Sequence, residues 1–343
     1  MKYVVEMRPE LAERIQTLVS KRKYDSVSQF AVAAIENQLL LEEGSEEQLG
    51  RLIAQGRDIE TVTTSEDKKV DIKSLLSLNF DPKRVKVVPP PDPGRTPTDC
   101  LWGQYNRIFP VKIVVRVLAN LLKDEEAIGL TVFQPYAILA AREIGSILKK
   151  KDREHKRKYG ELLSSALPTS RDSKKTDKRF LSHFVGYLTR AGRIEGAPAA
   201  LKFVNVFDDS EGNQKIGLTQ AGLTFALLDN PVLDKNDFER TLDKKESDFY
   251  IKHVFNNLER EGEVTSTILK AIAKGESNPS KLSTALGSFS RGWSAEMTNT
   301  IRAGVISRSH ELGLVDRIRQ GVRVSYTLTE YGQEILKTLP TTE

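Results

Sequence analysis

The first 43 residues of the chain carry a strand–helix–helix pattern that is too short to bury a stable core by itself. Residues 2–7 (KYVVEM) alternate like a short strand, and Pro9 opens a helix with apolar residues at helical spacing. After a turn at 23–25, Ser26 is placed to cap a second amphipathic helix. Because a segment of about 40 residues cannot form a core alone, it predicts an obligate homodimer through residues 1–43.

The succession of a strand, M-R-P-E-L, a helix, Y-x-S-x-S-x-F and a second helix resembles the CopG/Arc type of ribbon-helix-helix repressor. The resemblance implies that one strand from each chain pairs into a ribbon that enters the major groove of double-stranded DNA. It assigns the DNA contacts of this segment to Lys2, Val4, Glu6, Ser26 and Ser28. The family usually carries basic or small hydrogen-bonding residues on the outward strand positions, whereas Val4 offers only a thymine-methyl contact and Glu6 repels phosphate. The alternative is a dimerisation device that does not contact DNA.

The composition describes a soluble globular protein with room for two or three domains in 343 residues. No signal peptide and no apolar run long enough to span a bilayer is evident in the sequence. The net charge of +5 suits a polyanionic partner, but 52 basic residues nearly balance 47 acidic ones, so a DNA-binding surface requires local segregation of charge. The single cysteine, Cys100, excludes an internal disulfide framework and a cysteine-rich zinc site. We therefore expect a cytoplasmic, nucleoid-associated protein with no membrane partner.

Residues 44–98 are predicted to be a linker that is first acidic and later rich in proline. Within it, residues 72–80 form a short apolar patch that fits a small helix. Residues 89–94 (PPPDPG) indicate a stiff, extended spacer.

Two stretches after the linker each show helices followed by a hairpin and a closing helix. In residues 99–235, apolar residues repeat at helical spacing over 111–122, 134–148 and 181–188, although residues 112–117 (KIVVRV) also fit a strand. Two strands then flank a polar turn at 208–214 (DDSEGNQ). In residues 236–343 the pattern predicts a helix over 247–261 with Gly262 as its stop, a helix over 294–312, and a hairpin that turns at Gln320 and Gly321.

Both stretches end on the same short motif. Residues 216–228 (IGLTQAGLTFALL) and 326–337 (YTLTEYGQEILK) run from a strand end through Leu-Thr to a glycine that opens a helix. This L-T-x-x-G ending resembles the closing segment of winged-helix regulators of the MarR/PadR kind. The predicted fold class is therefore mainly α with small β elements (α+β). The predicted domains are a ribbon-helix-helix domain at 1–43, a linker at 44–98, and tandem winged helix-turn-helix domains at 99–235 and 236–343.

In a winged helix the third helix enters the major groove, and the wing reaches the sugar-phosphate backbone or the minor groove. The candidate DNA contacts of the first domain lie on the polar face of its third helix and just ahead of it, at Lys174, Lys175, Lys178, Arg179, Ser182, His183 and Arg190. The alternative is a solvated helix face. The wing opposes DNA binding because Asp208, Asp209 and Glu211 repel phosphates, so this domain either binds DNA without its wing or binds protein.

The second domain has a basic wing instead. Arg317, Arg319 and Arg323 surround its hairpin turn, and arginine at such a tip suits insertion into a narrow minor groove. The candidates on its third helix are Thr298, Asn299, Arg302 and Arg308. Asn299 carries the groups for a bidentate pair with adenine, although an ordinary helix surface explains it equally well.

Residues 149–158 (KKKDREHKRK) hold seven Lys or Arg against two acids. One interpretation is a solvated helix end, where cations complement the helix dipole. The other is a phosphate clamp, and the salt dependence of binding separates the two.

Signals of enzymatic activity are absent from the sequence, so no catalytic residue, cofactor or metal is predicted. Neither a phosphate-binding G-x-x-x-x-G-K-[ST] loop nor a G-x-G-x-x-G after a strand is found. The four histidines are scattered without the spacing of metal ligands.

These features together predict a homodimeric, sequence-specific double-stranded DNA-binding protein that regulates transcription and forms higher-order assemblies on DNA. One alternative is a DNA-binding protein of plasmid or chromosome partition or of replication initiation, which would recognise a tandem array of sites. Another is a nonspecific architectural DNA-binding protein or a protein scaffold, favoured by Glu6 and by the acidic first wing.

Overall fold

The computed structural model divides the chain into two compact units, residues 1–70 and 71–343. The described residues are 13, 16, 27, 71–78, 80–96, 100–158, 160–169, 173–289, 292–320 and 323–339. Glu13, Gln16 and Val27 are helical. The predicted DNA contacts of the ribbon lie outside the described residues: Lys2, Val4, Glu6, Ser26 and Ser28.

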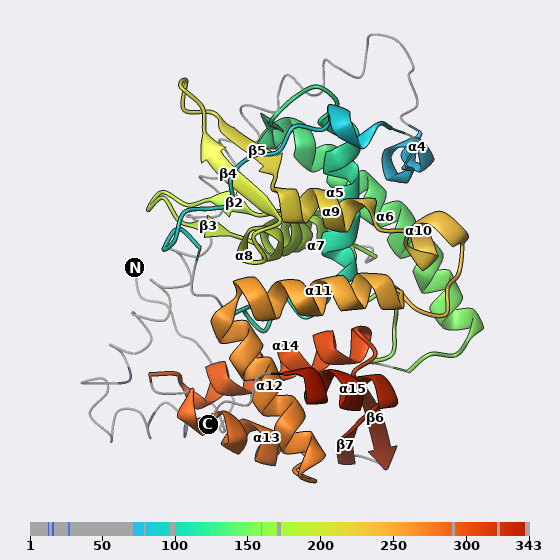
Figure 1. Ribbon diagram of the computed structural model, residues 1–343, viewed down its shortest axis with the longest axis vertical. Coiled ribbons are helices and arrows are strands. Elements are labelled where there is room, and N and C mark those ends of the chain that lie inside the picture. Colours follow the sequence, from blue (N-terminus) through green and yellow to red (C-terminus); the bar gives the residue numbers. More distant parts are fainter. Residues whose placement is uncertain are drawn as a thin grey trace. The chain divides into compact units, whose positions relative to one another are not determined.

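The second unit is mainly helical with small antiparallel sheets, which confirms the predicted fold class (Figure 1). We call residues 100–235 the first module and residues 244–338 the second module. The elements of the first module are α5 (Phe109–Leu121), β1 (Ile128–Gly129), α6 (Leu130–Glu154), α7 (Ser173–Phe180), the π-helical turn η3 (Leu181–Val185), β2 (Tyr187–Leu188), β3 (Ile194–Glu195), α8 (Ala197–Ala200), β4 (Val204–Asp208), β5 (Gln214–Leu218), α9 (Gln220–Leu227) and α10 (Pro231–Lys235).

The sheet of the first module has the strand order β1-β5-β4. Asp208 lies opposite Gln214, so the predicted polar turn does form the tip of the β4–β5 hairpin. The third helix is shorter than predicted, because α7 and η3 end at Gly186, whose φ of 96° suits glycine. A β-carbon at Gly186 would also overlap the backbone of Glu195. Residues 187–195 therefore form a separate small hairpin in place of the last turn of the predicted helix.

Residues 71–96, predicted to be linker, belong to the folded second unit. The predicted small helix is present as α4 (Ile72–Leu76), and a short turn, η2 (Pro82–Arg84), follows it. The backbone N–H of Val88 then donates to the carbonyl of Leu218 at 2.7 Å, so this stretch lies along β5. Val85 and Val88 of the predicted linker are buried in this unit, whereas residues 89, 90 and 92–94 of the predicted spacer are exposed.

The second module repeats the order of helices and hairpin. Its elements are α11 (Lys244–Asn257), α12 (Glu259–Ala273), α13 (Pro279–Ala285), η4 (Leu286–Ser288), α14 (Ala295–Glu311), β6 (Val315–Gln320), β7 (Arg323–Leu328) and α15 (Glu330–Thr338). The N–H of Tyr326 donates to Ser277 O at 2.9 Å, which is a single-bond counterpart of the β1–β5 pairing. The predicted helix stop at Gly262 is wrong: the chain breaks at Leu258, and Gly262 lies inside α12 against Phe255.

The shared L-T-x-x-G motif forms the same structure in both modules, which we call the Thr–Gly clamp. In the first module Thr219 Oγ1 donates to Lys202 O at 2.7 Å and accepts from Gly222 N at 3.1 Å. In the second, Thr329 Oγ1 donates to Gly313 O at 2.6 Å and accepts from Gly332 N at 2.9 Å. A β-carbon at either glycine would overlap the carbonyl of the residue just before the hairpin. The motif therefore requires threonine as a helix cap and glycine for close approach.

Helix α11 joins the two modules (Figure 1). Its Glu246 pairs with Lys112 of α5 at 2.9 Å, and both side chains are fully buried. Its Phe249 stacks on Phe225 of α9, with ring centroids 5.8 Å apart. On the opposite side, the Glu311 carboxylate of α14 accepts from the N–H groups that begin α5. The described parts of the two modules therefore pack into one body.

Three polar residues lie on the otherwise apolar helix α5 at a spacing of four. Lys112 donates to two carbonyls at the end of α9, and Arg116 donates to Ala226 O at 2.7 Å and pairs with Asp234 at 2.8 Å. Asn120 donates to carbonyls at the end of α4. We call Lys112, Arg116 and Asn120 the α5 polar stripe; it binds carbonyl groups that helix ends leave without partners.

Replacing Glu246 with Gln should destabilise the second unit by about 3 kcal/mol, because it leaves the Lys112 ammonium buried without a counter-charge. Burial already lowers the pKa of Lys112 to about 8 and raises the pKa of Glu246. Chemical denaturation of the wild type and of Glu246→Gln measures the difference in free energy of unfolding. Lys244→Gln on the exposed side of the same helix is the control, and equal losses in the two variants would contradict the assignment.

His253 of α11 makes stability depend on pH. Its Nε2 lies 2.7 Å from Leu201 O, so Nε2 carries a hydrogen and donates to this carbonyl, and burial lowers the pKa of His253. Because the folded pKa is lower than the unfolded one of about 6.5, the unfolded state takes up the proton first as pH falls. The free energy of unfolding should thus fall further between pH 7.5 and 5.5 (roughly one unit on either side of that value) in the wild type than in His253→Gln. His155→Gln, an exposed position, should behave like the wild type.

Candidate nucleic-acid interface

All the cations of helix α7 have exposed side chains: Lys174, Lys175, Lys178 and Arg179. The helix is fixed to α6 by Arg142, whose Nε donates to Asp177 Oδ1 at 2.9 Å. Phe180 of α7 and Phe184 of the following turn are buried in the core. The basic helix face predicted from the sequence is therefore exposed, on a helix that is fixed to α6.

Three predicted contacts near α7 have other surroundings. His183 packs its ring edge-on against Tyr105, with centroids 6.0 Å apart, and burial lowers its pKa. Ser182 is half-buried and donates to Arg179 O. Arg190 lies in the turn between β2 and β3 instead of on the helix, because the chain leaves the helical path at Gly186. The helical face predicted from residue spacing thus ends earlier than expected.

The acidic first wing is built around Asp209. Its carboxylate accepts from the N–H groups of Glu211 and Asn213 at 3.0 and 2.9 Å, and Gly212 adopts a φ of 80° in the turn. These hydrogen bonds lower the pKa of Asp209. One of the three wing acids therefore shapes the turn, while Asp208 and Glu211 remain exposed.

The predicted contacts on α14 are engaged inside the protein. Thr298 is 8% exposed, and its hydroxyl donates to Ser294 O. Asn299 is exposed but accepts from the Ser283 hydroxyl at 2.8 Å. Arg302 is half-buried and donates to Pro279 O at 2.7 Å, and burial lowers its pKa. Thr298 is therefore too deeply buried for direct base contact, while the other two already carry hydrogen-bond partners.

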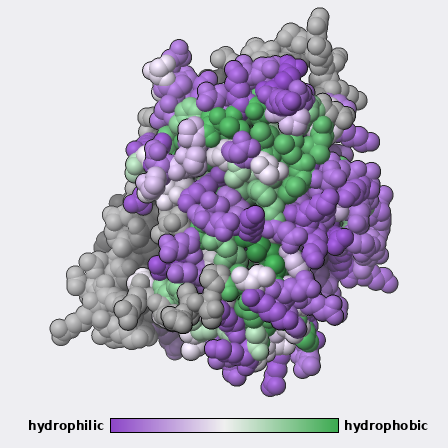
Figure 2. All heavy atoms as spheres, in the orientation of Figure 1, coloured by the Kyte–Doolittle hydropathy of each residue, from purple (hydrophilic) through white to green (hydrophobic). Residues whose placement is uncertain are grey.

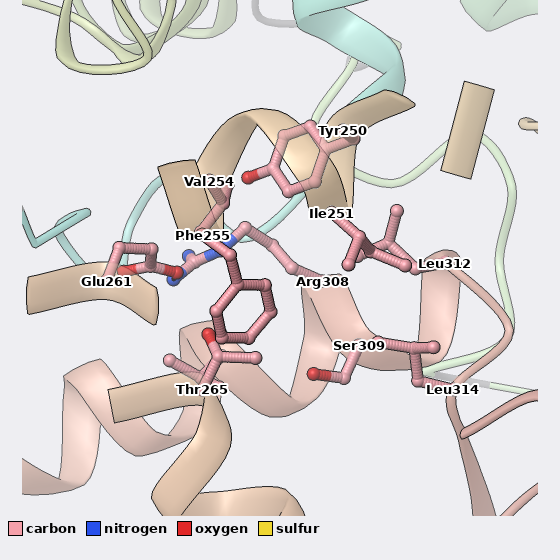
Figure 3. Close-up of a pocket in the computed structure, with 11 residues that line it drawn as sticks. Tyr250, Ile251, Val254, Phe255, Glu261, Thr265, Arg308, Ser309, Leu312 and Leu314 are labelled. Carbon is pink, nitrogen blue, oxygen red and sulfur yellow. Dashed lines mark hydrogen bonds and ion pairs between the residues drawn. The ribbon is translucent and has the colours of Figure 1, made fainter. Parts of the chain in front are cut away.

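Arg308 was predicted to contact DNA, and the structure corrects this prediction. It is 3% exposed, donates to Tyr105 O at 2.7 Å and pairs with Glu261 at 2.5 Å. Figure 3 shows its guanidinium directed toward Glu261, with Tyr250 of α11 beside the pair. Glu261 also accepts from the N–H of Leu101 at 3.0 Å. Arg308 therefore ties α14 to α12 and to the segment ahead of α5.

The three arginines of the second wing have different surroundings. Arg319 and Arg323 are exposed near the tip of the β6–β7 hairpin. Arg317, two residues nearer the base, is half-buried and lies with its guanidinium against Gly160 of the first module. Gly321 and Val322 at the turn itself lie outside the described residues.

The basic run at 149–158 is partly structural. Lys149 donates to Thr169 O at 2.7 Å, and Arg157 donates to Phe238 O at 2.6 Å. Four of its cations are exposed: Lys150, Arg153, Lys156 and Lys158. Hydrophilic side chains cover the right-hand flank in Figure 2, where the C-terminal end of α6 lies in Figure 1. Both predicted roles, a solvated helix end and a phosphate contact, remain compatible with this arrangement.

The buried polar residues that hold helix ends and loops in place were not predicted from the sequence. The α5 polar stripe has a signal in the sequence, since Lys112, Arg116 and Asn120 are spaced by four within an apolar run. Asp152, 3% exposed, has none, because most of its hydrogen bonds come from Leu163 and Ser164 in a later loop.

Comparison of the chain with protein-family models, with curated proteins and with solved structures finds no match in any of the three. In the described ranges, no helix has the length and apolar character needed to cross a membrane. Over the same ranges, no three His, Cys, Asp or Glu side chains gather as the ligands of a metal ion would.

Arg308 and Arg319 should respond differently to substitution. Arg308→Met leaves the Glu261 carboxylate buried without its partner, so we expect a loss of about 3 kcal/mol in the free energy of unfolding. Arg319→Met changes an exposed side chain and should stay within about 0.5 kcal/mol of the wild type. Chemical denaturation of both variants measures the contrast; comparable losses would mean that Arg319 is also a structural residue.

Proposed function

We propose that the chain is a homodimeric, sequence-specific double-stranded DNA-binding protein that regulates transcription. In this proposal the two modules are winged-helix domains, and residues 1–43 supply the dimer contact and a ribbon that reads DNA. The dimer and the ribbon rest on the sequence pattern described above. A two-fold dimer would recognise a near-palindromic site, because each half of the site meets the same surface.

The exposed basic face of α7 is the observation that carries the proposal. A helix of this kind fits the major groove, where lysine and arginine reach both phosphates and the acceptor groups of guanine. The ion pair between Arg142 and Asp177 and the buried Phe180 hold the helix against the module. Such anchoring keeps the cations in a fixed array, which lowers the entropic cost of binding.

The order of elements around α7 is also that of a winged helix. A helix (α5), a short strand (β1) and two helices (α6 and α7) precede the β4–β5 hairpin, with β2, β3 and α8 inserted before it, and β1 pairs with β5. The second module repeats this order and the Thr–Gly clamp. These likenesses support a common role for the two modules, each adding a modest contact to the same duplex.

The two modules would contact DNA in different ways. The first would use α7, since Asp208 and Glu211 at the tip of its wing repel phosphates. The second would use Arg319 and Arg323 of its wing, because the candidate residues of α14 already bind partners within the protein. Specificity would then come from α7 and the ribbon, while the second wing would add affinity.

A second candidate function is a nonspecific architectural binder. The internal hydrogen bonds of Asn299 and Arg302 favour it, since they leave α14 fewer free groups for reading bases. Partition or replication initiation is a third use of the same modules and would show as recognition of tandem sites.

Selection of bound duplexes from a random pool tests the proposal. We expect the wild type to enrich a symmetric motif, because the ribbon and α7 read bases. The triple variant Lys174→Gln/Lys178→Gln/Arg179→Gln should bind more weakly and lose about 3 from the slope of log affinity against log salt. The control Lys83→Gln/Lys86→Gln/Lys123→Gln removes the same charge from exposed positions elsewhere and should match the wild type.

The outcomes separate the candidate functions. A tandem rather than symmetric motif would favour partition or replication initiation. Enrichment of no motif, together with a steep salt dependence, would favour the architectural binder and contradict sequence-specific regulation. Failure of the wild type to retain any duplex would contradict all three.

A further inference from the structure

Two basic segments that are far apart in the sequence meet at Gly160. One is the run at 149–158, which ends α6 and enters the following loop; the other is the β6–β7 wing. The guanidinium of Arg317 lies so close to Gly160 that a β-carbon at this position would overlap Arg317 Nη1. Figure 1 shows the chain leaving α6 toward the second module. The contact joins a loop of the first module to the wing of the second.

The loop on the first-module side is held in one conformation by Asp152. This buried carboxylate accepts from the N–H groups of Leu163 and Ser164, both at 3.0 Å, and from the Ser164 hydroxyl at 2.7 Å. Arg157 pairs with the same carboxylate at 3.4 Å. The loop between these anchors carries Lys156 and Lys158 on the surface. These lysines therefore project from a braced backbone beside the wing.

The β6–β7 wing carries further basic residues beside this loop. Arg317 and Arg319 alternate along β6 and so point to the same side of the ribbon, about 7 Å apart along the strand. Arg323 is the partner of Gln320 at the end of the hairpin, so its side chain points to the opposite side of the ribbon. The nearby acids are Asp316, Glu161, Glu154 and Glu239; Glu154 pairs with Lys151, Glu161 accepts from the N–H of Lys158, and Glu239 lies 3.8 Å from Arg157. Cations predominate on this surface.

We infer that Lys156, Lys158, Arg317 and Arg319 form one phosphate-binding surface, the junction ridge, which contacts the backbone of duplex DNA across both modules. The inference rests on the proposed function and adds to it a contact that neither module makes alone. Its elements are the loop between α6 and α7 and strand β6 of the second wing.

A duplex backbone suits this surface better than other polyanions. Its phosphates form a rigid, regular array, and the ridge presents its cations from a braced loop and a paired hairpin. A flexible single strand or an acidic peptide needs no such rigid spacing. Arginine at the hairpin also matches the edge of a narrow minor groove.

Fluorescence anisotropy of the full chain with a mixed-sequence duplex at several salt concentrations tests the ridge. Lys156→Gln/Lys158→Gln should reduce the slope of log affinity against log salt by about 2 and Arg319→Gln by about 1, since each lost phosphate contact releases about one counterion fewer. Lys83→Gln/Lys123→Gln has the same change in net charge as the lysine pair, at exposed positions near the C-terminal end of α5, and should leave the slope unchanged.

Gly160→Ala tests the junction itself, because the new methyl group must displace the Arg317 guanidinium. Gly212→Ala is the matched control: its φ of 80° resembles the 98° of Gly160, but a β-carbon there meets nothing within 4 Å. We expect Gly160→Ala to weaken duplex binding several-fold more than Gly212→Ala. Thermal unfolding of both variants identifies any loss that comes from misfolding, and in that case Lys156→Gln/Lys158→Gln still tests the ridge.

Each result has one meaning. A slope of Lys156→Gln/Lys158→Gln equal to that of the charge control, with wild-type duplex binding intact, would overturn the ridge and leave the proposed function standing. Wild-type binding to single-stranded RNA or to anionic vesicles but not to the duplex would overturn both. Reduced slopes in both Lys156→Gln/Lys158→Gln and Arg319→Gln, but not in the charge control, would support the ridge.

Discussion

The fold of residues 71–343 depends on cations buried in helix α5. Lys112 and Arg116 are fully buried, yet nearly every donor they carry meets a carbonyl or a carboxylate. Their partners come from α4, α9, α10 and α11, so that the ends of four helices converge on one helix. A buried ion pair is seldom a large source of net stability compared with apolar packing. Its effect here is on specificity: an alternative arrangement of these helices would leave a charge in the core without a partner, which costs several kcal/mol.

The same chemistry makes the two modules one body. Glu246 and Glu311 reach from the second module to the middle and the beginning of α5, while Arg308 and Glu261 hold the segment that precedes it. A rigid pair of modules differs from two domains on a flexible tether, because it fixes the spacing between their surfaces. Under the proposed function, two contacts made by the pair would have to match one fixed separation on the DNA, and that match would add selectivity.

Periodicity predicted most helices of this unit because apolar spacing reflects the face that each helix buries. The Thr–Gly motif was visible because its chemistry is local. Predictions failed where the role of a residue depends on groups that are far from it in the sequence. Arg308 was predicted to be a surface residue, because its partner Glu261 is far from it in the sequence. The valines before the prolines were predicted to be in a linker, because their contact with β5 also joins distant residues. Gly262 resembles a helix stop, but the chain breaks at Leu258 and the glycine serves the packing of Phe255. Of the candidate interface, the exposed charges of α7 and of the second wing could be predicted, whereas their neighbours across the fold could not.

The Thr–Gly clamp has a consequence for how the two wings differ. In each module it fastens the residue that follows the hairpin to the residues that precede it, using backbone groups and one hydroxyl. The hairpin between these points is closed at its base whatever its tip contains. Its outer residues are consequently released from the task of holding the fold and are open to exchange. The hairpin tip carries acids in the first module and arginines in the second, although the same hydrogen bonds close both hairpins at the base.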